Sequence, residues 1–413
     1  MGVWFGAYNL VVHSWQLMAK IEDVLTKSLD IIKPTQVDDN ARKMAYEYVI
    51  QVIMKITKIS SMQDFTITSY GSFESGLHTK TSDIDVSVNV PGSSPQVLKQ
   101  IETEFFQDTT CTEVKAHWGD VPVVKMKVNV VVDETHFNIN CDITVNNKKG
   151  EFNTSILKAL AQRGPQIIDF VLLVKRWSTV AKLRDPYNGT FSSYAIYLLS
   201  IFFLQNHDPP LLPPLSEFVK FKITDSDSDR EKVILDAVVK YIHGQREIDD
   251  DAGSLFLKFI KMFQDVLTKG SNSYISIYHG KWINYEKKQN KQQRLVIEEP
   301  FELMKMGVLK SPFARIKDKT PVNILVKSER SHLEKIARAF TNTLQDLNND
   351  EARTGIIGKM VDPTYIPTYK KSKARSKISN IQFKATLTSG VKRVLKEYNN
   401  NDTQSRQGKV HKE

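Results

Sequence analysis

The sequence predicts an α+β fold, in which a small region of strands and helices is followed by a mainly helical region. Two observations support this prediction. Between residues 64 and 145, short runs alternate apolar and polar residues, as strands with one buried face do. After Phe152, apolar residues instead recur at helical spacing, and prolines and polar clusters separate the runs. The 413 residues are enough for roughly two or three domains.

The strand predictions come from alternation and from turn residues. In the run from Asp83 to Val90, the isoleucine and the valines share one face, whereas two aspartates, a serine and an asparagine share the other. Two longer alternating runs meet at Asp133-Glu134, which predicts a hairpin. Strands are therefore expected over Asp64–Tyr70, Asp83–Val90, Val123–Val132, Thr135–Val145 and Ser273–Tyr278.

The helix predictions rest on apolar spacing and on signals at the ends. Pro34 ends the first periodic run, and Asp38 and Asp39 provide the acidic first turn that favours a helix start. Helices are expected over Ser14–Ile32, Asp38–Ile59, Gln96–Phe106, Pro165–Ala181, Ser192–Asn206, Asp229–Gly244, Gly253–Thr268 and His332–Leu347.

The composition is that of a soluble globular protein, with 41% hydrophobic and 25% charged residues. The longest apolar run, Tyr194–Leu204, is too short to span a bilayer, and the N-terminus lacks the pattern of a signal peptide. Cys111 and Cys141 cannot form a disulfide framework, which indicates a reducing compartment. We therefore expect a cytoplasmic or nuclear protein that is neither secreted nor membrane-bound.

The positive charge is concentrated at the C-terminal end. Residues 369–413 contain 12 Lys or Arg and 3 Asp or Glu, a net charge of +9, whereas the whole chain carries +10. Beyond about Asp362 the composition turns polar and basic, which predicts a mostly disordered tail. Such a tail either binds a polyanion such as RNA or is merely solvated, and charge alone does not separate these two interpretations.

The sharpest local signal is a pair of aspartates on one strand face. Asp83 and Asp85 are two residues apart, so their carboxylates point the same way and repel one another unless a cation lies between them. Oxygen ligands of this kind suit Mg²⁺. Asp142 lies on the polar face of another predicted strand, and three carboxylates can hold the two metal ions that phosphoryl transfer uses.

Gly71-Ser72, which precedes the aspartate pair, fits the same chemistry. Glycine lets the backbone approach a phosphate closely, and a serine hydroxyl with adjacent amides can bind it. An Asp-x-Asp pair alone is more often a solvated strand face than a catalytic site. The combination with Gly-Ser and with a third strand-borne aspartate favours catalysis.

These motifs resemble the DNA polymerase β-like nucleotidyltransferase superfamily, in which Gly-Ser and Asp-x-Asp occur in this order. The stretches 141–154, 172–177 and 185–194, together with 297–302, further resemble the noncanonical poly(A) polymerases and terminal uridylyltransferases. Short strings around Pro213, Trp282 and His332 are similar to the plant terminal uridylyltransferases that tail small RNAs. The resemblance covers about residues 64 to 343.

The resemblance implies a polymerase β-like palm, which is a mixed sheet with flanking helices, and a mainly helical PAP-associated domain. It implies N-terminal helices over 1–36 that pack on the helical domain, a catalytic domain over 37–150, a helical domain over 151–361 with a nucleotide recognition motif near 297–305, and a basic tail over 362–413.

It also implies roles for individual residues. Asp83, Asp85 and Asp142 are the expected catalytic residues and ligands of Mg²⁺ or Mn²⁺. Ser72 is expected to contact the triphosphate, Asn147 and Thr154 the ribose, and Lys175 and Ser193 the β- and γ-phosphates, while Tyr194 stacks on the base. The full set of expected nucleotide-binding residues is Gly71, Ser72, Asn147, Asn153, Thr154, Lys175, Ser193, Tyr194, Glu299, Glu302 and Lys305.

Residue type alone suggests other roles for some of these positions. Lys175 and Tyr194 stand in apolar helical runs, so both could be core residues, and Asn147 could belong to a simple turn. Relatives often carry a second basic residue one turn after Lys175, where this chain has Thr179, and Lys182 would then have to substitute for it.

The expected activity is template-independent addition of nucleotides to RNA 3′ ends, with UTP favoured and ATP as the alternative. Base choice stays open because Lys305 occupies the position of a histidine that favours uracil in some relatives. Glu302 and Lys305 offer hydrogen-bonding groups that suit either base. A catalytically idle RNA-binding homologue and a nucleotide second-messenger synthase are the rival interpretations.

Overall fold

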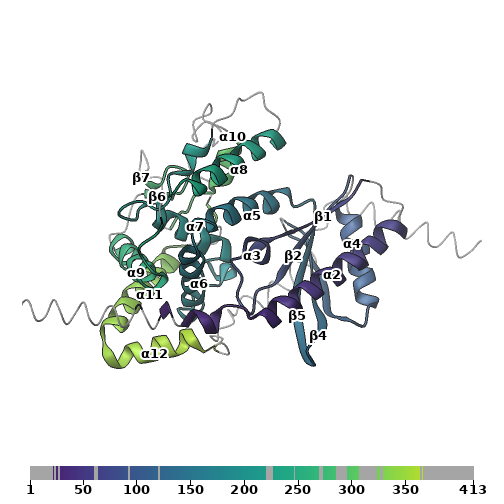
Figure 1. Ribbon diagram of the computed structural model, residues 1–413, viewed down its shortest axis with the longest axis horizontal. Helices are drawn as coiled ribbons and strands as arrows, with labels where there is room; N and C mark the ends of the chain where they lie inside the picture. The colour runs from purple at the N-terminus through teal and green to yellow at the C-terminus, as the bar shows by residue number, and fades with distance from the viewer. Residues whose placement is uncertain are drawn as a thin grey trace, which may run out of the picture. The chain divides into compact units, whose positions relative to one another are not determined.

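The mixed sheet predicted from the sequence is present, and helices cover one of its faces (Figure 1). The computed structural model describes residues 22, 25, 26, 28–59, 64–91, 94–119, 121–219, 227–245, 247–268, 273–284, 295–306, 323–325, 329–362 and 365. Most of the helix predicted over Ser14–Ile32 lies outside these residues, and so does nearly all of the basic tail.

Within the described residues, five strands form the sheet in the order β1-β2-β5-β4-β3. The pair β2–β5 is parallel, and the other neighbours are antiparallel. The strands are β1 (Thr66–Tyr70), β2 (Ile84–Asn89), β3 (Cys111–His117), β4 (Val123–Val132) and β5 (Thr135–Val145). The hairpin predicted at Asp133-Glu134 is confirmed, since both turn residues have positive φ and β4 and β5 pair on either side of them.

Helices α2 (Gln36–Ile59) and α4 (Ser94–Gln107) pack on the apolar face of the sheet. Ile84, Val86 and Val88 are fully buried against them, as the alternation in β2 predicts. The opposite face was predicted to be polar throughout β2, but Ser87 and Asn89 are buried as well. They are covered because helix α5 (Lys148–Ala161) begins above them, and Asn89 donates to Glu151 at 2.7 Å.

The strand β3 was not predicted from the sequence. Only Cys111 is buried in it, and Glu113, Lys115 and His117 are polar residues of an edge strand. Its register with β4 shifts between Thr112 and Lys115, so the simple alternation is interrupted. An edge strand with little buried surface leaves a weak periodic signal.

The chain after β5 is mainly helical. It contains α5, α6 (Pro165–Val180), α7 (Ser193–Gln205), α8 (Asp227–His243), α9 (Ala252–Thr268), α10 (Pro300–Met306), α11 (Arg330–Asn348) and α12 (Asp350–Val361), and the hairpin of β6 (Ser273–Ser276) and β7 (Lys281–Asn284). The predicted strand Ser273–Tyr278 is therefore shorter than expected, since a turn follows Ser276. The short helix α3 (Gly71–Ser75), between β1 and β2, was not predicted.

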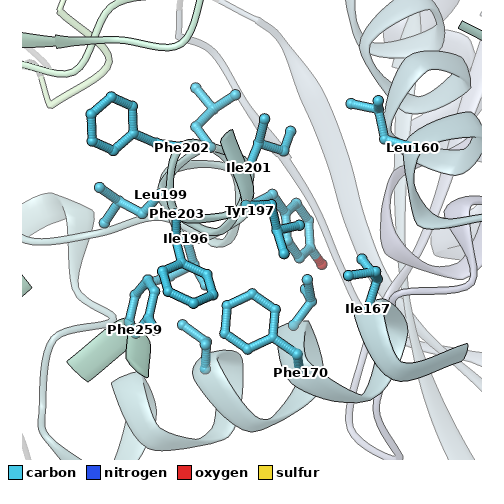
Figure 2. Close-up of a cluster of buried hydrophobic side chains, with 14 of the residues drawn as sticks. Leu160, Ile167, Phe170, Ile196, Tyr197, Leu199, Ile201, Phe202, Phe203 and Phe259 are labelled. Carbon is cyan, nitrogen blue, oxygen red and sulfur yellow. The ribbon is translucent and has the colours of Figure 1, made fainter. Parts of the chain in front are cut away.

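Helix α7 lies at the centre of the second large core. Every residue from Ala195 to Gln205 is buried, so this helix is surrounded on all sides. Figure 2 shows its side chains pointing in all directions toward residues of α5, α6 and α9, among them Leu160, Phe170 and Phe259. Leu25, Leu29 and Ile32 join the same core. Among the described helices, none is both long and apolar enough to cross a membrane.

A buried arginine connects α2 with the loop that leads into β2. Arg42 is 1% exposed, and its guanidinium donates to the backbone oxygens of Asp38, Thr79, Lys80 and Ser82. Burial lowers the pKa of Arg42, although nearby aspartates oppose this effect. The arginine thus fixes the loop immediately before Asp83.

Replacing Arg42 with glutamine should lower the free energy of unfolding by about 2 kcal/mol or more, because buried carbonyl oxygens lose their donors. The neighbouring Lys43 is exposed, so Lys43→Gln should change stability by no more than about 0.5 kcal/mol. Urea denaturation of both variants measures the difference. Equal unfolding free energies for the two variants would show that Arg42 does not hold the loop.

Candidate active site

The parallel pairing of β2 and β5 brings two aspartates face to face. Asp85 is the register partner of Asp142, and Asp83 precedes β2 by one residue. Asp85 and Asp142 are partly buried, whereas Asp83 is exposed. The three aspartates predicted as one group are thus brought together where β2 begins beside the inner part of β5.

These carboxylates carry more negative charge than their surroundings neutralise. Burial, together with the charges of Asp83 and Asp142, raises the pKa of Asp85 to about 7. Burial also raises the pKa of Asp142, even though Lys125 opposes the shift. The ammonium of Lys125 donates to Asp142 from the directly opposite position on β4. The site therefore favours a further positive charge.

The donor set fits a divalent cation that prefers oxygen ligands, such as Mg²⁺. Among the described residues, however, no three His, Cys, Asp or Glu side chains lie close enough together to hold a metal ion as they stand. The Lys125 ammonium instead serves as the counter-charge of Asp142. The three aspartates remain the residues that would hold the metal.

The sequence interpretation missed Lys125, although the hairpin contains the signal for it. Lys125 precedes the turn residue Asp133 by eight positions, and Asp142 follows Glu134 by eight. A two-residue turn fixes the register, so residues at equal distances from it lie opposite one another.

Gly71 brings the backbone against the aspartates. Its φ is +77°, and a Cβ atom on it would lie 2.0 Å from Oδ2 of Asp85. Its N–H donates to Oγ1 of Thr154 at 2.8 Å, and this hydroxyl donates in turn to the carbonyl of Gly150. Thr154 is 5% exposed, and these two hydrogen bonds hold the backbone of Gly71 against α5. Its predicted contact with the ribose stays a prediction.

Ser72 and Asn147 are close in sequence to the contact between Gly71 and α5, since Ser72 follows Gly71 and Asn147 precedes α5. Ser72 is the second residue of α3 and is partly exposed. Asn147 caps α5, because its side chain accepts from the N–H of Gly150 at 3.1 Å. Its backbone N–H donates to Ser87 Oγ at 3.1 Å. Asn147 thus joins the start of α5 to the sheet.

A chain of polar contacts extends from α5 toward the predicted recognition motif. Asn153 donates to the Tyr194 hydroxyl at 3.3 Å, and this hydroxyl donates to Oε1 of Glu299 at 2.8 Å. Lys149 lies 3.6 Å from Oε2 of the same glutamate. The buried Oδ1 of Asn153 has no hydrogen-bond donor among the described residues. Three residues predicted to bind the nucleotide thus meet at one place.

Lys175 is buried rather than presented to an open groove. Its ammonium donates to the Leu77 carbonyl, to Ser82 Oγ and to the Tyr197 hydroxyl at 3.1–3.2 Å. Burial and the nearby Arg184 lower the pKa of Lys175 to about 7. These contacts hold the loop before Asp83, and the predicted phosphate contact stays a prediction.

Ser193 begins α7, and its hydroxyl accepts a hydrogen bond from Nη2 of Arg184 at 2.8 Å. The sequence interpretation did not select Arg184 and instead named Lys182 as the substitute for a basic residue at Thr179. Arg184 donates to Thr179 Oγ1 at 3.3 Å, whereas Lys182 is exposed, and the role named for Lys182 stays a prediction. Glu302 and Lys305 belong to α10, and the structure describes their backbone but not their side chains.

An open cavity of about 520 Å³ adjoins the aspartates. It lies on the polar face of the sheet, opposite α2 and α4, where β3, β4 and β5 present polar side chains. Its lining includes Asp83, Asp142, Lys115, Lys125, Lys127 and Asn140. The aspartates are therefore followed by a row of three lysines, of which Lys127 is ion-paired with Glu113 of the same cavity at 2.6 Å.

Comparison with known proteins agrees with this geometry. Residues 21–162 match the family described as the central palm domain of mitochondrial-like poly(A) RNA polymerase. The chain is similar to poly(A) RNA polymerases and terminal uridylyltransferases. A solved structure of the Cid1 poly(U) polymerase has the same fold, with a TM-score of 0.64, 20% identity, and coverage of 83% of this chain and 98% of that one.

Among curated relatives, Protein HESO1 of Arabidopsis thaliana is 25% identical over 356 residues, which span 82% of this chain and 66% of the relative. Terminal uridylyltransferase cid1 of Schizosaccharomyces pombe is 29% identical over 168 residues, or 39% of this chain and 41% of the relative. The human poly(A) RNA polymerase GLD2 is 24% identical over 285 residues, or 62% of this chain and 57% of the relative. The chain thus spans less than two thirds of the length of these curated relatives.

The close approach of Gly71 to Asp85 can be tested with a matched glycine. Gly71 and Gly76 both have φ near +75°, so alanine costs about 1–2 kcal/mol of backbone strain at either position. Only at Gly71 does the added Cβ overlap another residue. Gly71→Ala should therefore cost about 1–3 kcal/mol more than Gly76→Ala.

A double variant identifies the cause. In the Gly71→Ala background, Asp85→Ala should recover most of the extra loss of unfolding free energy, because it removes the overlapping carboxylate. Urea denaturation of the four proteins in the cycle gives the coupling. Additive losses would mean that Gly71 and Asp85 do not compete for the same space.

Proposed function

We propose that this chain is a template-independent RNA nucleotidyltransferase that extends RNA 3′ ends and releases pyrophosphate, with UTP as the preferred substrate. The observation that carries the proposal is the register pairing of Asp85 with Asp142 beside Asp83, at a site with uncompensated negative charge. Similarity to poly(A) RNA polymerases and terminal uridylyltransferases supports the same reaction class.

Asp83, Asp85 and Asp142 would hold Mg²⁺ or Mn²⁺, which when bound would neutralise the triphosphate and lower the pKa of the RNA 3′-hydroxyl. The 3′-oxygen forms a bond with the α-phosphorus, and the bond to the bridging oxygen of the β-phosphate breaks. Asp142 is the candidate to accept the 3′-hydroxyl proton. Lys125, its neighbour on β4, would limit the negative charge of the site.

Asn153, Tyr194 and Glu299 form a group that could bind the nucleoside part of the substrate. Tyr194 offers an aromatic ring for stacking, and such stacking contributes about 1–3 kcal/mol per base. The unpaired Oδ1 of Asn153 offers an acceptor for a ribose hydroxyl. Glu299, which binds the Tyr194 hydroxyl, holds the ring in place. These groups suit any base.

The preference for UTP rests on the relatives. They include terminal uridylyltransferases and poly(A) RNA polymerases, so ATP is the alternative substrate. Glu302 and Lys305 are the residues proposed to read the base, since their acceptor and donor groups can serve either uracil or adenine. Substitution of Glu302 by glutamine should then blur whichever preference exists.

The row of lysines beside the aspartates supports RNA as the acceptor. Lys125 faces Asp142, and Lys127 is the next residue of β4 on the same face of the sheet. Lys115 on β3 is the register partner of Lys125. Phosphates of an RNA strand whose 3′ end reaches the aspartates would lie along this row. If the basic tail binds RNA rather than being merely solvated, it would add contacts that depend on salt in the same way.

The proposed reaction is tested by incubating the purified chain with Mg²⁺, a labelled RNA and each NTP in turn. The RNA should lengthen, most with UTP, and Asp142→Ala should abolish lengthening because the site loses a metal ligand and the proton acceptor. Glu47→Ala removes an exposed carboxylate of α2 and should retain activity. Predominant addition of A would overturn the base preference alone, whereas RNA binding without extension would favour an idle RNA-binding homologue.

The RNA path predicts a loss of binding that depends on salt. Substituting Lys115 and Lys127 with glutamine should weaken binding of single-stranded RNA and lower the slope of log affinity against log salt by about 0.7 per lost phosphate contact. Lys99 lies on α4, which packs on the opposite face of the sheet, so Lys99→Gln should leave affinity and slope unchanged. An unchanged slope in the double lysine variant would exclude this face as the RNA path.

A further inference from the structure

The loop between α6 and α7 contributes a cation that has no carboxylate partner among the described residues. Arg184 is partly buried, and the described contacts of its guanidinium are two side-chain hydroxyls, those of Thr179 and Ser193. Surface arginines usually pair with carboxylates or water. A partly buried guanidinium held only by neutral hydroxyls keeps its full charge available to an anion.

A second cation lies close to this arginine. Arg184 is the strongest charged influence on Lys175, and it lowers the pKa of that lysine. Two neighbouring positive charges repel one another, so an anion placed between them is favoured. The charges of Asp83 and Asp85 also act on Lys175 and raise its pKa, so the two cations lie near the aspartates.

The groups around Tyr197 define where such an anion would lie. Ser72 from α3 hydrogen-bonds to the Tyr197 hydroxyl, which also lies within electrostatic reach of Arg184 and Asp85. Ser193 stands at the N-terminus of the 13-residue helix α7, where the helix dipole adds partial positive charge. Cations, hydroxyls and a helix terminus therefore surround one position next to the aspartates.

The loop that precedes Asp83 also approaches Arg184. An open cavity of about 260 Å³ is lined by Arg184, Thr179 and the segment 79–81, which contains Lys80. The cations of α6 are already engaged here: Lys175 has three acceptors, and Arg176, which also lines the cavity, donates to backbone carbonyls of residues 359–365. Thr179, one turn after Lys175, is neutral. Arg184 is positioned to supply the missing charge.

We propose that Arg184 binds the terminal phosphates of the incoming nucleoside triphosphate, together with Ser193, and takes the place that the neutral Thr179 leaves open on α6. This inference rests on the proposed function, since it concerns the triphosphate of the same substrate. A guanidinium can bind two phosphate oxygens at once, which a lysine ammonium cannot do in the same fixed geometry.

The test measures binding directly, without catalysis. Affinities of the full chain for UTP, for UMP and for inorganic tripolyphosphate are determined by calorimetry. Arg184→Gln should weaken binding of UTP and tripolyphosphate by about ten- to a hundredfold, the scale of a lost charged hydrogen bond, and should leave UMP binding nearly unchanged. Lys182→Gln, which removes an exposed charge two residues away, should change none of the three affinities.

A second variant separates loss of charge from loss of fold. Thr179→Lys, added to Arg184→Gln, returns a cation to α6 next to Ser193 and should recover most of the affinity for UTP and tripolyphosphate. Unaltered UTP and tripolyphosphate affinities in Arg184→Gln would overturn the inference, and so would an equal loss of UMP binding that Thr179→Lys does not rescue.

The same experiment distinguishes failure of this inference from failure of the proposed function. If the wild-type chain extends RNA but Arg184→Gln has the UTP affinity and KM of the wild type, only the inference fails. If the wild-type chain binds UTP but extends no RNA, and Arg184→Gln weakens UTP binding, the inference stands and the proposed polymerase activity fails. A wild-type chain that binds neither UTP nor tripolyphosphate would overturn both.

Discussion

The repulsion between carboxylates is the constraint on which the rest of the site depends. Asp85 and Asp142 occupy paired positions on adjacent parallel strands, and burial makes their charges harder to maintain. A purely structural sheet gains nothing from such a pair. The surrounding structure accommodates it: Lys125 faces one carboxylate, and Gly71 has no side chain where the other needs room. Arg42 fixes the loop from which the third aspartate extends.

Helix α5 connects the part of the proposed substrate site that contains the aspartates with the part that contains Tyr194. Its first turn is anchored to the sheet by Asn147, and Thr154 on the same helix binds the backbone of Gly71. Between them, Asn153 reaches Tyr194 on α7. One helix therefore relates the position of the aspartates proposed to bind metal to that of the ring that would stack on the base, and displacement of either end would be transmitted along a hydrogen-bonded element.

Local patterns predicted the parts of the fold that bury one face of an element. The β4–β5 hairpin and the helix α7 follow directly from alternation, turn residues and apolar runs. The edge strand β3 and the covered residues Ser87 and Asn89 did not follow, because their environments are set by neighbours distant in sequence. The three aspartates could be chosen from spacing and resemblance. Arg184 could not, since only the folded loop returns it to Ser193.

The hydrogen bonds of Tyr194 have a consequence for how the chain would tell substrates apart. Its hydroxyl is held by both Asn153 and Glu299, so the ring has little rotational freedom left to lose when a base arrives. A preorganised ring increases affinity for every nucleotide equally, because the conformational entropy is lost on folding and not on binding. Selectivity must then come from groups that contact the edge of the base and that fit one base better than another. Because the stacking ring is fixed, these groups meet every base in the same position.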